Sequence, residues 1–108
     1  MATTLKNYIT ANVGTSPLTV YNPTTAGIQS TLIGLVLANT TTSAVTASVT
    51  LTSASTTVYI IKNVTLPSGN SLDIIGGSKI IIEQNDSLQV TSSTASSIDV
   101  TVSTVEVI

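Results

Sequence analysis

Aliphatic and hydroxyl-bearing side chains alternate along much of this chain, most regularly from Val45 to Thr52. In that stretch an aliphatic side chain occupies every odd position and Thr or Ser every even one. A period of two is that of a β-strand with one buried and one exposed face. Thr and Ser make up 36 of the 108 residues, and Val, Ile and Leu another 33. Because β-branched side chains favour a pleated sheet, the sequence predicts an all-β fold.

Short β-rich runs recur between turn residues such as Ser16-Pro17 and Asn22-Pro23. This is the pattern of two packed antiparallel sheets. We predict one domain over residues 1–108, an antiparallel β-sandwich, Ig-like or jelly-roll-like, of about seven or eight strands. The runs with strand character are Leu5–Val13, Leu18–Tyr21, Ile28–Ala38, Val45–Thr52, Val58–Val64, Leu72–Ile75, Lys79–Glu83, Leu88–Val90 and Ile98–Ile108.

Three of these runs carry further predictions. The stretch Leu32–Leu37 is apolar at both parities apart from Gly34, which indicates a strand buried on both faces. The pair Gly76-Gly77 separates Leu72–Ile75 from Lys79–Glu83, so these two runs are predicted to form a hairpin.

The last run changes its apolar parity. Ile98, Val100 and Val102 share one face, whereas Val105 and Val107 fall on the other. A one-residue slip moves every later side chain across the sheet. The sequence therefore predicts either a bulge near Ser103-Thr104 or a strand end that buries its opposite face.

The chain is poor in the side chains that carry most protein chemistry. It has three Lys, five Asp or Glu, a net charge of −2 and no Arg, His, Cys, Trp or Phe. Without clustered cations it lacks the electrostatic basis for nucleic-acid binding, and without His or Cys it lacks the usual proton carriers and soft metal ligands. We expect no enzyme activity, cofactor, metal or nucleic-acid partner. With no secretory signal and no apolar run of spanning length, we also expect no membrane partner.

Four carboxylates, Asp73, Glu83, Asp86 and Asp99, are the candidates for paired catalytic acids. The three aspartates stand at or beside predicted turns, where a short carboxylate caps backbone N–H groups. We therefore expect a turn role rather than acid catalysis. The segment Glu83–Ser87 offers several oxygen ligands but lacks the spacing of a calcium loop, so a solvated loop is expected there.

Isolated polar side chains also have ordinary structural explanations. A serine nucleophile needs an adjacent base, and the nearest arrangement is Lys79 with Ser78 or Ser87. Lys79 is expected instead to be an edge-strand lysine that blocks unwanted pairing. The three tyrosines of the chain are expected at the edge of the core.

A polar but almost uncharged surface favours assembly with other subunits. Charged residues make up 7% of this chain, whereas ordinary soluble domains carry about a quarter. Hydroxyl-lined faces pack against other subunits without stripping ions of water. The terminal segments are the favoured contacts, because the parity change leaves two valines in need of cover. The interface residues that we expect are Leu5, Tyr8, Val105, Val107 and Ile108.

Several short motifs occur in an order that spans most of the chain. They are Tyr59-Ile-Ile-Lys-Asn63, Leu66-Pro-Ser-Gly69, Gly77-Ser-Lys-Ile80, Asn85-Asp-Ser-Leu88 and Ile98-Asp-Val100 with Val105-Glu106, preceded by the similar Leu5–Thr15, Ile33-Gly34 and Asn39-Thr40. In this order they resemble the small virion structural proteins of tailed bacteriophages, notably phages of aquatic bacteria. Where that family would have Gly-Asp, this chain has Asn85-Asp86, and Asn tolerates the same left-handed turn.

The resemblance implies a small β-sandwich repeated symmetrically on a particle. We therefore expect a non-enzymatic virion structural protein, foremost a capsid decoration or cement protein that stabilises the shell as a symmetric homo-oligomer, a trimer. Its partners would be copies of itself and the major capsid protein or other virion proteins, and it would join the virion in the cytoplasm of the bacterial host. Two alternatives stay open: a neck, tail or fibre component, and a host-surface or carbohydrate-binding β-sandwich module.

Overall fold

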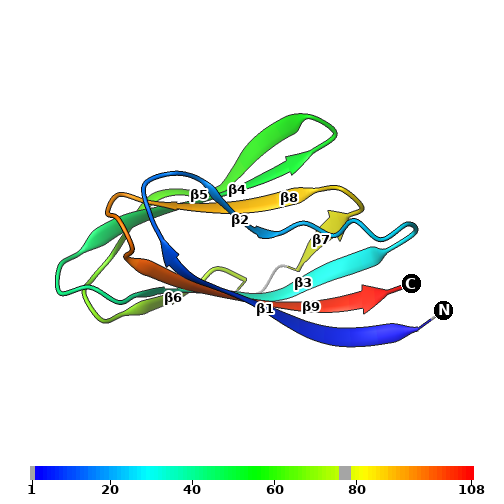
Figure 1. The fold of residues 1–108 in the computed structure, drawn as a ribbon, viewed down its shortest axis with the longest axis horizontal. Coiled ribbons are helices and arrows are strands. Elements are labelled where there is room, and N and C mark those ends of the chain that lie inside the picture. Colours follow the sequence, from blue (N-terminus) through cyan, green and yellow to red (C-terminus); the bar gives the residue numbers. More distant parts are fainter. Residues whose placement is uncertain (1, 76–78) are drawn as a thin grey trace.

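Two antiparallel β-sheets packed face to face make up the structure, a computed structural model that describes residues 2–75 and 79–108 (Figure 1). The strands are β1 (Thr3–Val13), β2 (Leu18–Tyr21), β3 (Gln29–Asn39), β4 (Val45–Ser53), β5 (Thr56–Leu66), β6 (Ser71–Asp73), β7 (Ile80–Glu83), β8 (Ser87–Ser92) and β9 (Ile98–Val107). The predicted all-β antiparallel sandwich is confirmed. The described residues form no helix that could cross a membrane.

β6 and β7 lie end to end along the same edge of β3. β6 pairs with Val36–Ala38 and β7 with Gln29–Leu32, and the described residues show no pairing between the two. The predicted hairpin of Leu72–Ile75 with Lys79–Glu83 is therefore wrong, and its turn, Gly76-Gly77, lies outside the described residues. β3 has eleven residues, which is long enough to bond both short strands. The nine observed strands exceed the seven or eight expected, and β6 and β7 together fill one strand position beside β3.

The strand order is that of a jelly roll. One sheet runs β1-β9-β3 with β6 and β7 at its far edge, and the other runs β2-β8-β4-β5. The first strand pairs with the last, and most connections pass from one sheet to the other. In an Ig sandwich the first two strands share a sheet, whereas here β1 and β2 lie in different sheets. Two such layers with one strand position shared by β6 and β7 correspond to the eight-stranded jelly roll.

A β-bulge explains the unbroken apolar run in β3. The register with β9 shifts between Leu32 and Gly34, so Ile33 is the extra residue and Leu32 and Leu35 both face the core. The outer face of β3 presents Ile33, which is 37% exposed, and half-buried Val36. The prediction that this strand is buried on both faces is therefore wrong, because two inward leucines separated by a bulge give the same apolar run.

β9 keeps a single alternation along its whole length. Every even residue from Ile98 to Glu106 is buried, while Ser103, Val105 and Val107 are half-buried on the opposite face. Its register with β1 is unbroken from Val107 back to Val100. A bulge within β9 was the wrong alternative, because the bulge lies on β3 opposite Ser103 and Thr104. The two valines instead lie on the outer face of the sheet.

The core fills the space between the sheets from positions of one parity. In β4 the aliphatic side chains Val45, Ala47 and Val49 are buried and Leu51 is half-buried, as the alternation predicted. They meet the leucines of β3 and the inward residues of β8 and β9 in one cluster. Both chain termini lie at the same end of the sandwich (Figure 1), where backbone hydrogen bonds join Ala2 to Ile108.

Candidate functional site

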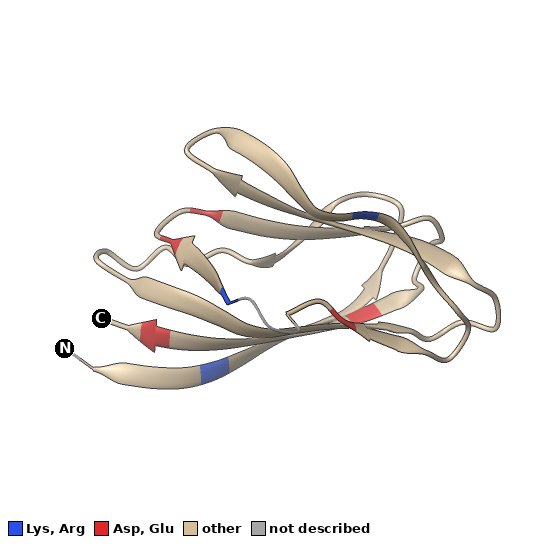
Figure 2. Cartoon of the chain, turned by 180° about the vertical axis from the view of Figure 1, so that it is seen from behind, with Lys and Arg blue, Asp and Glu red and all other residues tan. Residues whose placement is uncertain are grey.

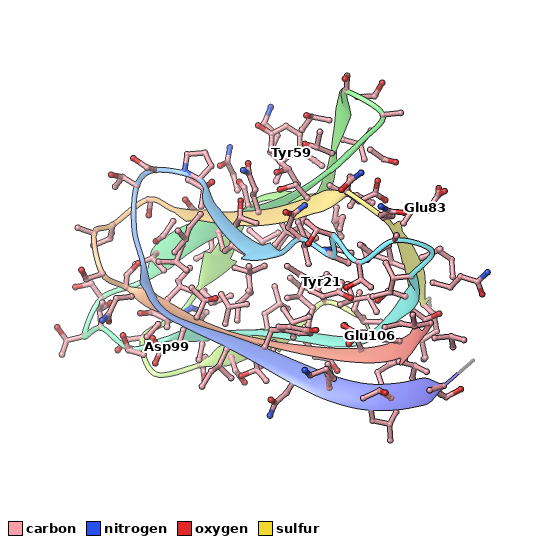
Figure 3. The ribbon with its side chains drawn as sticks, turned by 45° about the vertical axis from the view of Figure 1, so that its right-hand side comes forward. Tyr21, Tyr59, Glu83, Asp99 and Glu106 are labelled. Carbon is pink, nitrogen blue, oxygen red and sulfur yellow. The ribbon has the colours of Figure 1, made fainter. Side chains whose placement is uncertain are left out.

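A buried carboxylate lies between the sheets at the end that carries the termini. Glu106 is only 6% exposed, and its Oε2 accepts hydrogen bonds from the hydroxyls of Tyr8 at 2.5 Å and Tyr21 at 2.7 Å. Thr104 donates a longer bond of 3.3 Å to the same oxygen. Figure 3 shows Tyr21 and Glu106 directed toward one another between the two layers. With Ser30, whose hydroxyl lies 2.7 Å from that of Tyr21, these residues form what we call the tyrosine–carboxylate cluster.

The cluster joins both sheets. Tyr21 comes from β2, whereas Tyr8, Ser30 and Glu106 come from β1, β3 and β9 of the opposite sheet. The rings of Tyr8 and Tyr21 pack with centroids 4.8 Å apart at a 47° tilt, a favourable arrangement for an aromatic pair. A buried carboxylate costs free energy unless it is hydrogen-bonded, and the tyrosine hydroxyls supply that compensation.

The electrostatics of the cluster hold its protons in place at neutral pH. Burial raises the pKa of Tyr21 to about 12, and the hydrogen bond to Glu106 acts in the same direction. Burial and the Glu106 carboxylate also raise the pKa of Tyr8. Burial by itself would raise the pKa of Glu106, but the hydrogen bonds from Tyr8, Tyr21 and Thr104 outweigh it and lower that pKa. The arrangement is therefore a fixed set of charge-assisted hydrogen bonds rather than a proton-transfer pair near pH 7.

A cavity of about 530 Å³ opens beside the cluster. Its walls include Lys6, Tyr8, Tyr21, Glu106 and the loop Asn22–Thr25. The ammonium of Lys6 lies 5.9 Å from the centroid of the Tyr8 ring, and its positive charge also favours the anionic form of Glu106. The cavity is mixed in polarity, because both charged groups, Lys6 and Glu106, line it together with Thr, Val and Ile side chains.

Sequence reasoning missed this cluster. The signal was the parity of β9, since continuing the even positions past Val102 places Thr104 and Glu106 inward. A charged residue at an inward position requires hydrogen-bond donors, and with no Arg or His in the chain the tyrosine hydroxyls are the obvious ones. The valines at odd positions, Val105 and Val107, instead suggested that the parity of the strand changes.

The residues predicted at an interface are divided between the two faces of one sheet. Leu5, Val105 and Val107 lie on the outer face, with Leu5 directly opposite Val105. Ile108 follows the end of β9 and is 54% exposed. Tyr8 points the other way, into the tyrosine–carboxylate cluster. The structure thus brings three of the five residues together, leaves Ile108 at their border and places Tyr8 between the sheets.

Exposed aliphatic side chains cross the outer face of this sheet. Leu5, Val105, Thr31 and Ile81 form one cross-strand row over β1, β9, β3 and β7. Leu5 is 74% exposed and Ile81 62%. With their neighbours they form what we call the outer aliphatic face, made of Leu5, Ile9, Ile33, Ile81, Val105 and Val107. The row itself contains no charged residue, and charges are sparse over the whole chain (Figure 2).

The three aspartates accept hydrogen bonds from backbone N–H groups, two of them at turns as predicted, whereas the Glu83 carboxylate makes no hydrogen bond among the described residues. Asp73 accepts a hydrogen bond from the N–H of Ile75, and Asp99 accepts one from the N–H of Asn12. Asp86 accepts one from the N–H of Glu83 across a turn in which Asn85 has a φ of 70°.

The other candidate chemical groups do not gather into a site. Among the described residues no three Asp or Glu side chains are close enough to hold a metal ion. Lys79 is exposed, and of its two candidate serine partners Ser78 lies outside the described residues. Tyr59 is exposed on β5, away from the cluster, with Lys62 placed 5.1 Å from its ring centroid (Figure 3).

No protein-family model matches this chain, and no curated protein sequence is significantly similar to it.

Proposed function

We propose that this chain is a non-enzymatic structural protein of a bacteriophage virion, foremost a capsid decoration or cement protein that stabilises the shell through contacts of a symmetric homo-oligomer. Its partners are further copies of itself and the major capsid protein or other virion proteins. The observation that carries the proposal is the outer aliphatic face, a set of exposed branched side chains on adjacent strands. An uncovered apolar surface of this kind is typical of a protein that works in contact with another.

The energetics of burial support this role. Complete burial of one aliphatic side chain of this size is worth about 1.5–3 kcal/mol, and Leu5, Ile9 and Ile81 are all more than half exposed. Burying the central row strips no ion of water, because Leu5, Val105, Thr31 and Ile81 are all uncharged. Covering this row therefore gains apolar contact at little electrostatic cost.

The fold and the motif order add support of a weaker kind. Jelly rolls occur in viral capsid proteins and also in lectins, so the fold is compatible with the proposal without selecting it. The resemblance in motif order to small phage virion proteins favours the virion. The tyrosine–carboxylate cluster then has a structural role, since it ties β9 to β2 across the sandwich.

The test replaces Val105 and Val107 together by Asp. Both are half-buried on the outer aliphatic face, so two carboxylates there should block association with a shell while the core stays intact. The measurement is incorporation of the variant into particles, alongside urea unfolding of the isolated chain. A matched control places Asp at Thr42 and Thr65, which are exposed elsewhere, and should be incorporated normally. Normal incorporation of the Val105/Val107 variant, or its failure to fold as an isolated chain, refutes the assigned role of this face.

Copy number separates the positions on a virion. Tomography of particles carrying a labelled chain should find dozens to hundreds of copies on the shell, whereas a handful at one vertex or along the tail supports the neck, tail or fibre alternative. Absence from purified particles would end the proposal.

The cavity beside Tyr8 and Tyr21 is the observation that favours the carbohydrate-binding alternative. The two rings pack on one another rather than opening as a platform, which favours the structural role. A glycan array without binding would discard this alternative.

A further inference from the structure

The sheet edges of this sandwich differ in how well they are protected against pairing with another chain. β2 has only four residues and lies between Pro17 and Pro23. β6 and β7 are short. β5 is long, but its register with β4 shifts twice around Val49, and Asn63 has a positive φ. Short strands, prolines and bulges are the usual protections of an edge.

β1 carries such protection only at its far end, where its register with β9 shifts between Thr10 and Val13 and Asn12 has a positive φ. It has eleven residues and forms the margin of its sheet beyond β9 (Figure 1). It contains no proline, and its register is regular from Thr3 to Thr10. Its one charged residue, Lys6, lies on the inner face with Tyr8, because both pair with inward residues of β9.

The backbone of β1 offers its free groups at odd positions. The N–H and C=O of Ala2 both bond to Ile108, so Ala2 is a hydrogen-bonded pair with the end of β9. These pairs alternate along an antiparallel ladder. The even residues of β1 therefore bond to β9, and the N–H and C=O of Thr3, Leu5, Asn7 and Ile9 point to the open edge.

We propose that two copies of this chain associate through β1, antiparallel and about a two-fold axis at Asn7, to form one continuous sheet across the dimer. In this register Leu5 of each copy lies opposite Ile9 of the other on the outer face. Lys6 of each copy lies opposite Tyr8 of the other on the inner face, a pairing that suits a cation and an aromatic ring.

Neighbouring registers of the two β1 strands pair less favourable side chains. An axis at Lys6 places two ammonium groups opposite one another and sets Leu5 against Asn7 of the other copy. An axis at Tyr8 pairs Ile9 with Asn7 instead of with an aliphatic side chain. Like charges directly opposite destabilise a sheet, and aliphatic pairs stabilise it. Of these three registers, the one about Asn7 alone sets aliphatic residues opposite one another and keeps the two lysines apart.

The dimer deepens the proposed function and rests on the self-association proposed there, although it requires no position on a virion. It sets two outer aliphatic faces side by side on one extended sheet. A two-fold pair is a different association from the trimer expected from the sequence, and measurement of mass in solution separates them. Failure of virion incorporation and failure of dimerisation are likewise separate observations.

Cysteine cross-linking tests the register. The chain has no cysteine, so a single introduced thiol reports one contact. At the axis the two Asn7 Cα atoms of a hydrogen-bonded pair are about 5.5 Å apart, within the span of a disulfide. Asn7→Cys should therefore form a disulfide-linked dimer on mild oxidation. Leu5→Cys, on the same strand and face, should not, because Leu5 of one copy lies opposite Ile9 of the other, four residues away from the second Leu5. Equal cross-linking of both variants overturns the proposal.

A charge exchange gives a second readout that does not depend on oxidation. Asn7→Asp and Asn7→Lys should each raise the dimer dissociation constant, by up to about fivefold, and mixing the two variants should restore dimerisation. The same two substitutions at exposed Thr65 should change nothing, alone or mixed. Light scattering on the unmodified chain should give twice its 11.0 kDa mass. A monomer at all concentrations, a trimer, or no rescue on mixing overturns the proposal.

Discussion

Replacement of Glu106 by Gln is the most informative single perturbation, because it removes the charge of the tyrosine–carboxylate cluster while keeping the shape of the side chain. A hydrogen bond to a charged group contributes about 1.5–3 kcal/mol to stability, and a neutral one about 0.5–1.5 kcal/mol. Glu106 accepts two short bonds from tyrosines. Weakening each by about 1 kcal/mol should lower the free energy of unfolding at pH 7 by about 2 kcal/mol. For a domain of this size the midpoint of thermal unfolding should fall by about 8 °C.

The pH dependence follows from the direction of the pKa shift. The pKa of Glu106 is lower in the folded chain than its ordinary value of 4.5. The folded state therefore binds this proton less readily than the unfolded state, and its contribution to stability is fully present above the unfolded pKa. It is lost as the pH falls through the folded pKa, with a slope of at most about 1.4 kcal/mol per pH unit. The stability difference between the wild type and Glu106→Gln should be constant from pH 6 to 8 and shrink below about pH 5.

The assay is urea unfolding followed by far-ultraviolet circular dichroism at a series of pH values. Other carboxylates titrate in the same range, so the informative quantity is the difference between the two proteins at each pH. Glu83→Gln is the matched control, because Glu83 is exposed and its side chain makes no hydrogen bond within the described residues. It should change stability by less than about 0.5 kcal/mol. A Glu106→Gln variant as stable as the wild type at pH 7, or a difference that persists unchanged to pH 3, refutes the reasoning.

Three further substitutions probe other parts of the structure, each read out by urea unfolding. Tyr21→Phe leaves the buried hydroxyl of Ser30 without its partner and should lower the free energy of unfolding by about 2 kcal/mol. In the double variant with Glu106→Gln, the loss of stability should fall short of the sum of the two single losses by about 1 kcal/mol. Strict additivity would show that the residues do not act as a cluster. Leu35→Ala removes a fully buried side chain from the core and should cost about 2–5 kcal/mol, whereas a loss below 1 kcal/mol would contradict its placement. At Asn85, where φ is 70°, Val should cost about 1–2 kcal/mol and Gly almost nothing, and equal effects would argue against a left-handed turn.

The fold was predictable where the sequence carries one period through one strand. From Val45 to Thr52 in β4 each aliphatic residue faces the core and each hydroxyl faces outward, because β4 pairs with β8 without a shift in register. The prediction failed where two strands compensate one another. An extra residue in β3 at Ile33 keeps both Leu32 and Leu35 inward, and no local pattern distinguishes this from a strand covered on both faces. The end-to-end placement of β6 and β7 likewise depends on the length of β3, a strand far away in sequence.

The candidate site was predictable only in part, for a related reason. The parity of the apolar residues indicated that Leu5, Val105 and Val107 face away from the core, toward a partner or solvent. The inward position of Glu106 conflicts with the general rule that carboxylates are exposed. It is stabilised by hydroxyls that come from other strands, Tyr8 from β1 and Tyr21 from the other sheet, and no pattern within β9 contains those contacts.

The placement of the charged residues connects the cluster to the outer surface. With so few charged side chains, each position matters for what the surface can contact. Asp73, Asp86 and Asp99 are held at backbone N–H groups, and Glu106 is enclosed between the sheets. At this end of β9 the inward position carries the carboxylate of Glu106 and the outward positions carry Val105 and Val107, whereas farther along the strand Ile98, Val100 and Val102 face the core in the ordinary way. Asp73, Glu83 and Asp99 occupy exposed outward positions of the same sheet, but the central row of Leu5, Val105, Thr31 and Ile81 is uncharged. An apolar centre with charges toward its margin is the arrangement expected of a surface that is covered in use.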